Sequence, residues 1–158
     1  MALTPIKYPP RLDLARIPTP LQFLSRASDK WGAGKRLWMK RDDLTGATLT
    51  GNKIRKLEFI AAHALAHGFE TLVTCGGVQS NHCRATALVA AQLGLDCHLV
   101  LRADDELEQN TGNFLLDQLA GATFEILPAK EWATHLKAIY ARLESEFAEA
   151  GRPALMIP

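Results

Sequence analysis

The hydrophobic positions after residue 50 follow two alternating spacings, and this alternation predicts the fold class. Short apolar runs, typical of buried strands, occupy residues 71–75, 96–102, 122–127 and 154–157. Apolar residues spaced by three or four positions predict helices over about 52–67, 80–93, 111–119 and 132–150. Strands and helices that alternate at these lengths form right-handed βαβ units. We therefore predict an α/β fold in three layers, with a parallel sheet covered by helices on both faces.

The two ends of the chain differ from this regular pattern. Residues 1–35 show weak periodicity and contain five prolines, which predicts an arm with only short elements. LWMK at 37–40 could be a strand that runs into the polar stretch RDDLTG. The sequence stops at Pro158, directly after a predicted strand, where a ligand-binding loop of an α/β sheet is expected. We therefore expect the chain to be incomplete.

Charge is unevenly distributed, although the formal net charge is only +1. Residues 1–60 carry 12 Lys/Arg against 5 Asp/Glu, whereas residues 61–158 carry 6 against 12. The cations are scattered and no groove-reading motif accompanies them, so the first half suits small anions better than nucleic acid. The composition, 47% hydrophobic and 22% charged, is that of a soluble globular protein.

The cysteines indicate a reducing compartment. Cys75, Cys83 and Cys97 are odd in number and form no CxxC pair, and the N-terminus lacks an apolar run. These features favour a cytoplasmic protein without export or membrane insertion, in which the thiols are small buried side chains.

The stretch LTGNKIRKLEF (49–59) places positive charge at an unusual position. With Asn52 as N-cap, Lys53, Arg55 and Lys56 fall in the first helical turn, where the helix macrodipole favours anions. Adjacent cations, desolvation and a helix N-terminus all disfavour the ammonium form of a lysine. A neutral Lys53 could act as a nucleophile or a base, and could attach pyridoxal phosphate or abstract a carbon-bound proton. The alternative is a solvated basic turn.

The stretch TLVTCGGVQSNHCRA (71–85) predicts a strand, a diglycine turn and a helix start. Glycines allow close approach of the backbone to a ligand, and free N–H groups around Ser80, Asn81 and His82 could receive a carboxylate or phosphate. Ser80 could donate its hydroxyl, and Asn81 could donate and accept. The alternative is that Ser80 or Asn81 only caps the helix.

Other site types do not match. CGGVQSNH lacks the GK[ST] ending of a P-loop, and it fits neither GxSxG nor GxGxxG. His63 and His67 lie four residues apart without the glutamate of HExxH, so we expect a solvated or core-edge pair and no metal site.

The two motifs together resemble a known family. KRDDLTGATLTGNKIRKLEF followed by TCGGVQSNHCRATA is similar to the pyridoxal-phosphate enzymes of the D-cysteine desulfhydrase and 1-aminocyclopropane-1-carboxylate deaminase family. These enzymes have the tryptophan-synthase-β-like fold, called fold type II. The likeness extends to TGNFLLDQLAGA and GRPALMIP.

The resemblance implies roles for individual residues. Lys53 matches the lysine that holds pyridoxal 5'-phosphate through its amine and moves the substrate α-proton. Asn81 matches the asparagine that hydrogen-bonds the ring hydroxyl of the cofactor. Ser80, with the backbone of the 79–82 turn, matches the group that receives the substrate carboxylate near the reacting carbons. His82 is more typical of the desulfhydrases, because the deaminases usually have glutamine there.

The implied reaction is α,β-elimination of D-cysteine to pyruvate, hydrogen sulfide and ammonia. Family members are about twice as long, and their second half supplies the phosphate loop, the partner of the pyridine nitrogen and a tyrosine near the substrate. By this resemblance, residues 1–50 are an incomplete segment of the large domain and residues 51–158 are the small domain. Full-length members are expected to be homodimers. The alternatives are a 1-aminocyclopropane-1-carboxylate deaminase and a truncated, non-catalytic fragment.

Overall fold

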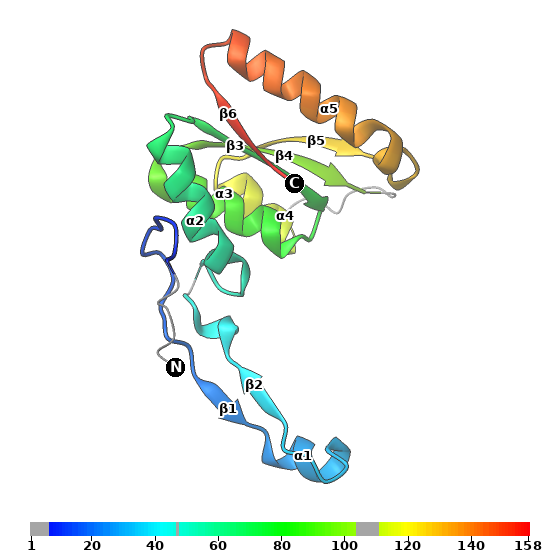
Figure 1. Ribbon diagram of the computed structural model, residues 1–158. Coiled ribbons are helices and arrows are strands. Elements are labelled where there is room, and N and C mark those ends of the chain that lie inside the picture. Colours follow the sequence, from blue (N-terminus) through cyan, green and yellow to red (C-terminus); the bar gives the residue numbers. More distant parts are fainter. Residues whose placement is uncertain (1–6, 47, 104–110) are drawn as a thin grey trace.

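The central sheet of the computed structural model has four parallel strands in the order β5–β4–β3–β6 (Figure 1). The structure describes residues 7–46, 48–103 and 111–158. The strands span Thr71–Gly77 (β3), Asp96–Arg102 (β4), Thr123–Leu127 (β5) and Ala154–Ile157 (β6). The helices span Lys53–Ala66 (α2), Asn81–Leu93 (α3), Gly112–Leu119 (α4) and Ala129–Glu149 (α5). The predicted α/β fold is confirmed. α5 begins at Ala129, a few residues before the predicted start, because Lys130 and Glu131 are polar and give no apolar signal in the sequence.

Helices cover both faces of the sheet, as the sequence pattern predicts. α2, α3 and α4 lie on one face and α5 lies on the other (Figure 1). Leu72 and Leu99 belong to the core under α2, α3 and α4, whereas Val73 and Val100 pack with Leu143 of α5. This division follows from the two-residue period of a strand. Within the described ranges, every helix is too short or too polar to span a lipid bilayer.

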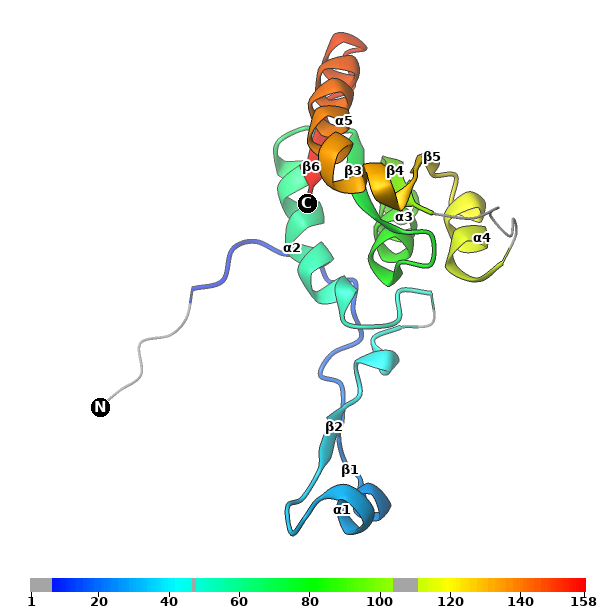
Figure 2. The same cartoon turned by 90° about the vertical axis from the view of Figure 1, so that its right-hand side faces the viewer.

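The N-terminal arm extends away from the sheet (Figure 2). It contains β1 (Leu21–Phe23), α1 (Ser25–Trp31), β2 (Trp38–Lys40) and a short 3₁₀ helix, η1 (Asp42–Leu44). β1 and β2 pair antiparallel. An isolated two-stranded hairpin is at best marginally stable in water, so the arm depends on contacts with the rest of the chain.

Glu58 of α2 connects the chain before β1 to the α/β unit. Its carboxylate is buried and accepts hydrogen bonds from the backbone N–H groups of Leu14 and Ala15, both at 2.9 Å. Arg11 Nη1 lies 3.5 Å from Glu58 Oε2, and the N–H of Leu12 donates to the Glu58 carbonyl at 3.0 Å. One buried side chain thus satisfies backbone donors about 45 residues away in the sequence.

We expect the purified chain to self-associate through the arm. Leu21, Trp31 and Trp38 of the arm are 62%, 70% and 51% exposed, and exposed large apolar side chains favour association. Light scattering over a range of protein concentrations should give a mass that rises above that of one chain. Replacing Leu21 and Trp38 by serine should reduce this rise, and a constant monomeric mass for the unmodified chain would contradict the expectation.

Candidate active site

A cavity of about 500 Å³ lies where the N-termini of α2 and α3 meet. Lys53 of α2 and Asn81 of α3 both line it. The other lining residues are Lys40, Asp42, Asp43, Thr50, Gly51, Asn52 and Arg84. Arg84 Nη2 donates to the carbonyl of Thr50 at 2.8 Å and ties α3 to the segment before α2. The cavity thus combines two of the predicted site residues, whereas Ser80 and His82 are not among its lining residues.

The three cations of the first α2 turn have different environments. Arg55 forms a bidentate ion pair with Asp42, with both N–O distances at 2.7 Å, and Thr19 Oγ1 donates to the same carboxylate at 2.7 Å. The hydrogen bonds from Arg55 and Thr19 lower the pKa of Asp42 to about 2. Lys56 Nζ lies 3.3 Å from His82 Nε2, and partial burial and the charge of Lys53 lower the pKa of Lys56.

Lys53 differs from its neighbours, because its side chain forms no hydrogen bond or ion pair with any residue that the structure describes. Arg55 therefore attaches α2 to the arm and Lys56 contacts His82, whereas Lys53 lines the cavity without a partner among the described residues. The expectation that Lys53 is neutral stays a prediction.

His82 is half-buried behind the α3 N-terminus. Its Nε2 lies 3.1 Å from Thr74 Oγ1 as well as close to Lys56. An ammonium at Lys56 can only donate, so a hydrogen bond from Lys56 requires an Nε2 that carries no hydrogen. Burial, with the charges of Lys56 and Lys53, lowers the pKa of His82 to about 4. A role of His82 in substrate binding stays a prediction.

We expect an NMR titration of His82 to give a midpoint near 4, well below the ordinary histidine value. The unfolded chain takes up this proton at higher pH, so the contribution of neutral His82 to stability is lost as pH falls from 6.5 towards 4. Buried Asp117, whose pKa is raised to about 7 by burial, acts in the opposite direction, so the titration is followed at His82 itself. Lys56→Ala should raise the midpoint, and a midpoint above 6 in the unmodified chain would contradict this assignment.

Ser80 is the N-cap of α3, as the capping alternative predicts. Its Oγ accepts from the N–H groups of His82 at 3.2 Å and Cys83 at 3.3 Å, while its hydroxyl hydrogen is left to donate. The expectation of three free N–H groups is therefore wrong in part. The N–H of His82 is used by the cap and that of Ser80 donates to Gly77 at 2.8 Å, whereas the Asn81 N–H has no partner among the described residues.

Gly76 makes room for this turn. A Cβ atom at Gly76 would lie 2.7 Å from Ser80 Oγ and 2.9 Å from Cys83 Sγ, which is closer than real contacts. A Cβ at Gly77 would meet nothing within 4 Å. Only the first glycine of the diglycine turn is therefore required for steric reasons.

The sequence interpretation missed a group of polar side chains behind Asn81. Asn113, near the start of α4, donates through Nδ2 to Asn81 Oδ1 at 3.0 Å and to the Gln79 carbonyl at 2.8 Å. The Asn113 N–H donates to Gln79 Oε1 at 2.8 Å. The only sequence signal was TGN at the start of the predicted helix over 111–119, which local periodicity does not connect to residue 81.

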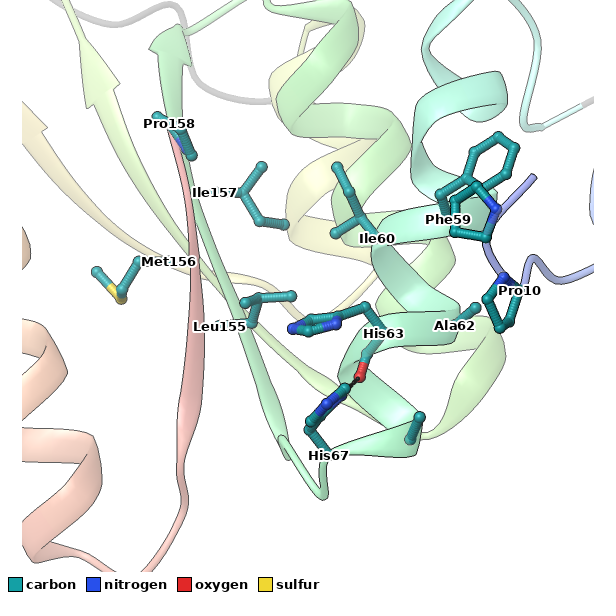
Figure 3. Close-up of a pocket in the computed structure, with 12 residues that line it drawn as sticks. Pro10, Phe59, Ile60, Ala62, His63, His67, Leu155, Met156, Ile157 and Pro158 are labelled. Atoms are coloured by element: carbon teal, nitrogen blue, oxygen red, sulfur yellow. Dashed lines mark hydrogen bonds between the residues drawn. The ribbon is translucent and has the colours of Figure 1, made fainter. Parts of the chain in front are cut away.

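A second cavity, of about 430 Å³, lies between α2 and β6 and is mainly apolar (Figure 3). Leu155 and Ile157 point towards α2, whereas Met156 points to the other face of the sheet. His63 and His67 are exposed at this cavity, with His67 Nδ1 2.8 Å from the His63 carbonyl. Among the described residues, no group of three or more His, Cys, Asp or Glu side chains is placed to hold a metal ion.

Comparison with known protein families shows to which family the chain belongs. The sequence model described as "Pyridoxal-phosphate dependent enzyme" matches residues 12–158, nearly the whole chain. The chain belongs to this family. The predicted family affiliation and the dependence of that family on pyridoxal phosphate are confirmed.

Individual members of the family are similar to this chain in sequence. A D-cysteine desulfhydrase of Klebsiella pneumoniae is 43% identical over 153 residues, covering 92% of this chain and 45% of that protein. A mitochondrial bifunctional D-cysteine desulfhydrase/1-aminocyclopropane-1-carboxylate deaminase of Arabidopsis thaliana is 38% identical over 155 residues, covering 92% of this chain and 37% of that protein. The chain thus spans less than half the length of these relatives.

Solved structures agree with the fold. An "ACC deaminase homologue" superposes with a TM-score of 0.83 at 40% identity, covering 95% of this chain and 44% of that chain. An O-ureido-L-serine synthase superposes with a TM-score of 0.66 at 20% identity, which supports the fold alone. These comparisons agree with the predicted fold type.

Proposed function

We propose that the chain is the N-terminal part of a pyridoxal-phosphate-dependent lyase that eliminates hydrogen sulfide from D-cysteine. The observation that carries the proposal is that the unpaired Lys53 amine and the Asn81 amide line one cavity at two helix N-termini. The relatives named D-cysteine desulfhydrase supply the substrate class. On the same basis, residues 1–50 are proposed as a segment of a larger domain and residues 51–158 as the small domain.

The residues of the cavity fit the cofactor. A primary amine without a protein partner suits the aldehyde, and the amide of Asn81 suits the ring oxygen. Lys40 and Arg84 line the cavity together with the carboxylates of Asp42 and Asp43, so its lining carries both signs of charge. By the family resemblance, the loop that holds the cofactor phosphate belongs to the second half of the full-length members. When bound, pyridoxal phosphate supplies an aldehyde for attachment and a ring that withdraws electrons from the substrate α-carbon.

The protein groups then have distinct tasks. Once the substrate amine had replaced it at the cofactor aldehyde, the Lys53 amine would be free to take the α-proton of D-cysteine, and the ammonium so formed would protonate the departing thiolate to hydrogen sulfide. Hydrolysis of the resulting aminoacrylate gives pyruvate and ammonia. The Ser80 side chain is held as the α3 cap, and we propose that its hydroxyl hydrogen is the donor to the substrate carboxylate. His82, fixed behind α3, is proposed to contribute to substrate recognition through Lys56 and the turn.

A second candidate activity is opening of the ring of 1-aminocyclopropane-1-carboxylate. It is favoured by the names of the structural neighbour and of the bifunctional relative. A third reading is a fragment without activity, because the chain covers less than half of its relatives. We also propose a cytoplasmic location, to which three free cysteines are suited, a homodimer for the full-length protein, and no nucleic-acid partner.

Absorbance spectroscopy with pyridoxal phosphate tests the proposal. The purified chain should develop a visible band at about 410–420 nm, characteristic of a cofactor bound through a lysine, and borohydride should make the attachment permanent. Lys53→Ala should lose the band, whereas Lys137→Ala, which removes an exposed lysine of α5, should retain it. A spectrum unchanged by Lys53→Ala would contradict the proposal.

Product analysis then separates the candidate activities. Sulfide and pyruvate from D-cysteine support the desulfhydrase, whereas a four-carbon oxo acid from 1-aminocyclopropane-1-carboxylate supports the deaminase. A chain that binds the cofactor at Lys53 but converts neither substrate is a fragment whose catalysis requires further sequence.

A further inference from the structure

Three side chains from α3, α4 and the turn between β3 and α3 form one hydrogen-bonded group behind the cavity. Asn113 uses both hydrogens of its Nδ2, one towards the Gln79 carbonyl at 2.8 Å and the other towards Asn81 Oδ1 at 3.0 Å. Gln79 Oε1 accepts from the Asn113 N–H at 2.8 Å, and Gln79 Nε2 donates to the Thr111 carbonyl at 3.3 Å.

The chemistry of the partners fixes the direction of each amide. A backbone carbonyl can only accept, so the NH₂ end of Asn113 has to face Gln79, because the reverse orientation would oppose two acceptors. The same NH₂ end faces Asn81, so Asn81 has to present its carbonyl oxygen to Asn113. The Asn81 NH₂ group is then directed away from Asn113, and it has no acceptor among the residues that the structure describes.

The local backbone holds this arrangement in place. Gly112 has φ +56°, and a Cβ atom there would lie 2.3 Å from Gln79 Oε1. Glycine at this position therefore permits both the left-handed conformation and the close approach of Gln79 to the start of α4. The position of Asn113 relative to Asn81 is consequently set by two segments more than 30 residues apart in the sequence.

We infer that Asn113 is a positioning residue that turns the Asn81 amide so that its NH₂ group, not its carbonyl, serves a ligand in the cavity beside Lys53. The inference rests on the proposed function for the identity of that ligand. If pyridoxal phosphate occupies the cavity, Asn81 would donate to its ring oxygen, which would be bound as an acceptor. Asn113 itself touches neither the cofactor nor the substrate.

A comparison of two cofactor analogues tests this role. Asn113→Asp replaces the double donor by an acceptor, which repels both the Gln79 carbonyl and Asn81 Oδ1 and reverses the Asn81 amide. Equilibrium dialysis should show binding of pyridoxal phosphate weakened about tenfold, the effect expected for one lost hydrogen bond. The affinity for 3-deoxypyridoxal phosphate, which lacks the ring oxygen, should be nearly unchanged.

A matched control separates positioning from a general loosening of α4. Leu119→Ala removes a side chain that is 74% exposed on the same helix, and it should leave both affinities unchanged. If Asn113→Asp weakens both cofactors equally, the residue has only a structural role and the inference is overturned. Far-UV circular dichroism checks that the variant retains its helices.

NMR of the chain without cofactor provides a readout that does not depend on the proposed function. A scalar coupling across the hydrogen bond between Asn113 Nδ2 and Asn81 Cγ should be detectable, and the Asn81 side-chain amide should shift in Asn113→Ala. Unchanged Asn81 resonances in that variant would overturn the inference. If the coupling is present but the unmodified chain does not bind pyridoxal phosphate, the proposed function fails for this chain while the orientation of Asn81 stands.

Discussion

Replacing Glu58 by alanine is expected to lower the free energy of unfolding by about 2–4 kcal/mol, because it leaves two backbone donors without an acceptor. The N–H groups of Leu14 and Ala15 both donate to Glu58 Oε1 at 2.9 Å, and the Glu58 side chain is buried. Water cannot fully replace the lost carboxylate at this position. Urea unfolding followed by tryptophan fluorescence measures the change, since Trp31 and Trp38 report on the arm and Trp132 on α5.

Two variants show whether the hydrogen bonds are responsible for this effect. Glu58→Gln retains an oxygen for Leu14 and Ala15 and weakens only the contact with Arg11, so its loss should be clearly smaller. Glu144→Ala, at an exposed position of α5, should change stability by less than about 0.5 kcal/mol. If Glu58→Ala is no more destabilising than Glu144→Ala, Glu58 does not anchor the arm.

Replacing Gly76 by alanine is expected to lower the free energy of unfolding by about 1–3 kcal/mol, the usual result of overpacking. The new Cβ would lie 2.7 Å from Ser80 Oγ, 2.8 Å from Ser80 Cβ and 2.9 Å from Cys83 Sγ. Relief of these contacts has to displace the α3 cap, so the variant should also lose affinity for pyridoxal phosphate. Urea unfolding and equilibrium dialysis measure the two effects.

Gly77→Ala is the matched control for this prediction. A Cβ at Gly77 meets no atom within 4 Å, and its φ lies outside the left-handed region. The variant should therefore unfold within about 0.5 kcal/mol of the unmodified chain. Equal stabilities of the Gly76 and Gly77 variants would show that the turn does not depend on the steric constraint described above.

The fold could be predicted because its signals are local. Apolar runs and helical spacing after residue 50 identified the order of strands and helices, and glycines such as Gly68 and Gly94 marked helix ends. The start of α3 followed from Ser80, which the structure confirms as its cap. The contact between Glu58 and residues 11–15 has no local signature, because it joins segments that are distant in the sequence.

The site could be predicted only in part for the same reason. Two motifs with suitable chemistry indicated Lys53 and Asn81, and both line the same cavity. The sequence interpretation counted too many free backbone N–H groups around Ser80. Helix capping uses the N–H of His82, and the turn uses the N–H of Ser80. Asn113 was missed because its contact with Asn81 depends on how α4 packs beside α3.

The positive charge at the start of α2 now has a physical explanation. Asp42 neutralises Arg55 and attaches the helix to the arm, and Lys56 is directed to His82. Lys53 alone of the three has no side-chain partner among the described residues, and it lines the cavity between the N-termini of α2 and α3. Two of the three cations thus hold the surrounding structure, and we propose that the amine of Lys53 serves a ligand.

The most direct test of this account is to locate the cofactor after reduction. The chain is mixed with pyridoxal phosphate at a stoichiometric ratio, treated with borohydride, digested and analysed by mass spectrometry. We predict that one phosphopyridoxyl group is found on Lys53 and that the total modification drops sharply in Lys53→Ala. Modification spread evenly over Lys56, Lys40 and exposed lysines, or an unchanged total in the variant, would contradict the assignment of Lys53 as the cofactor-binding residue.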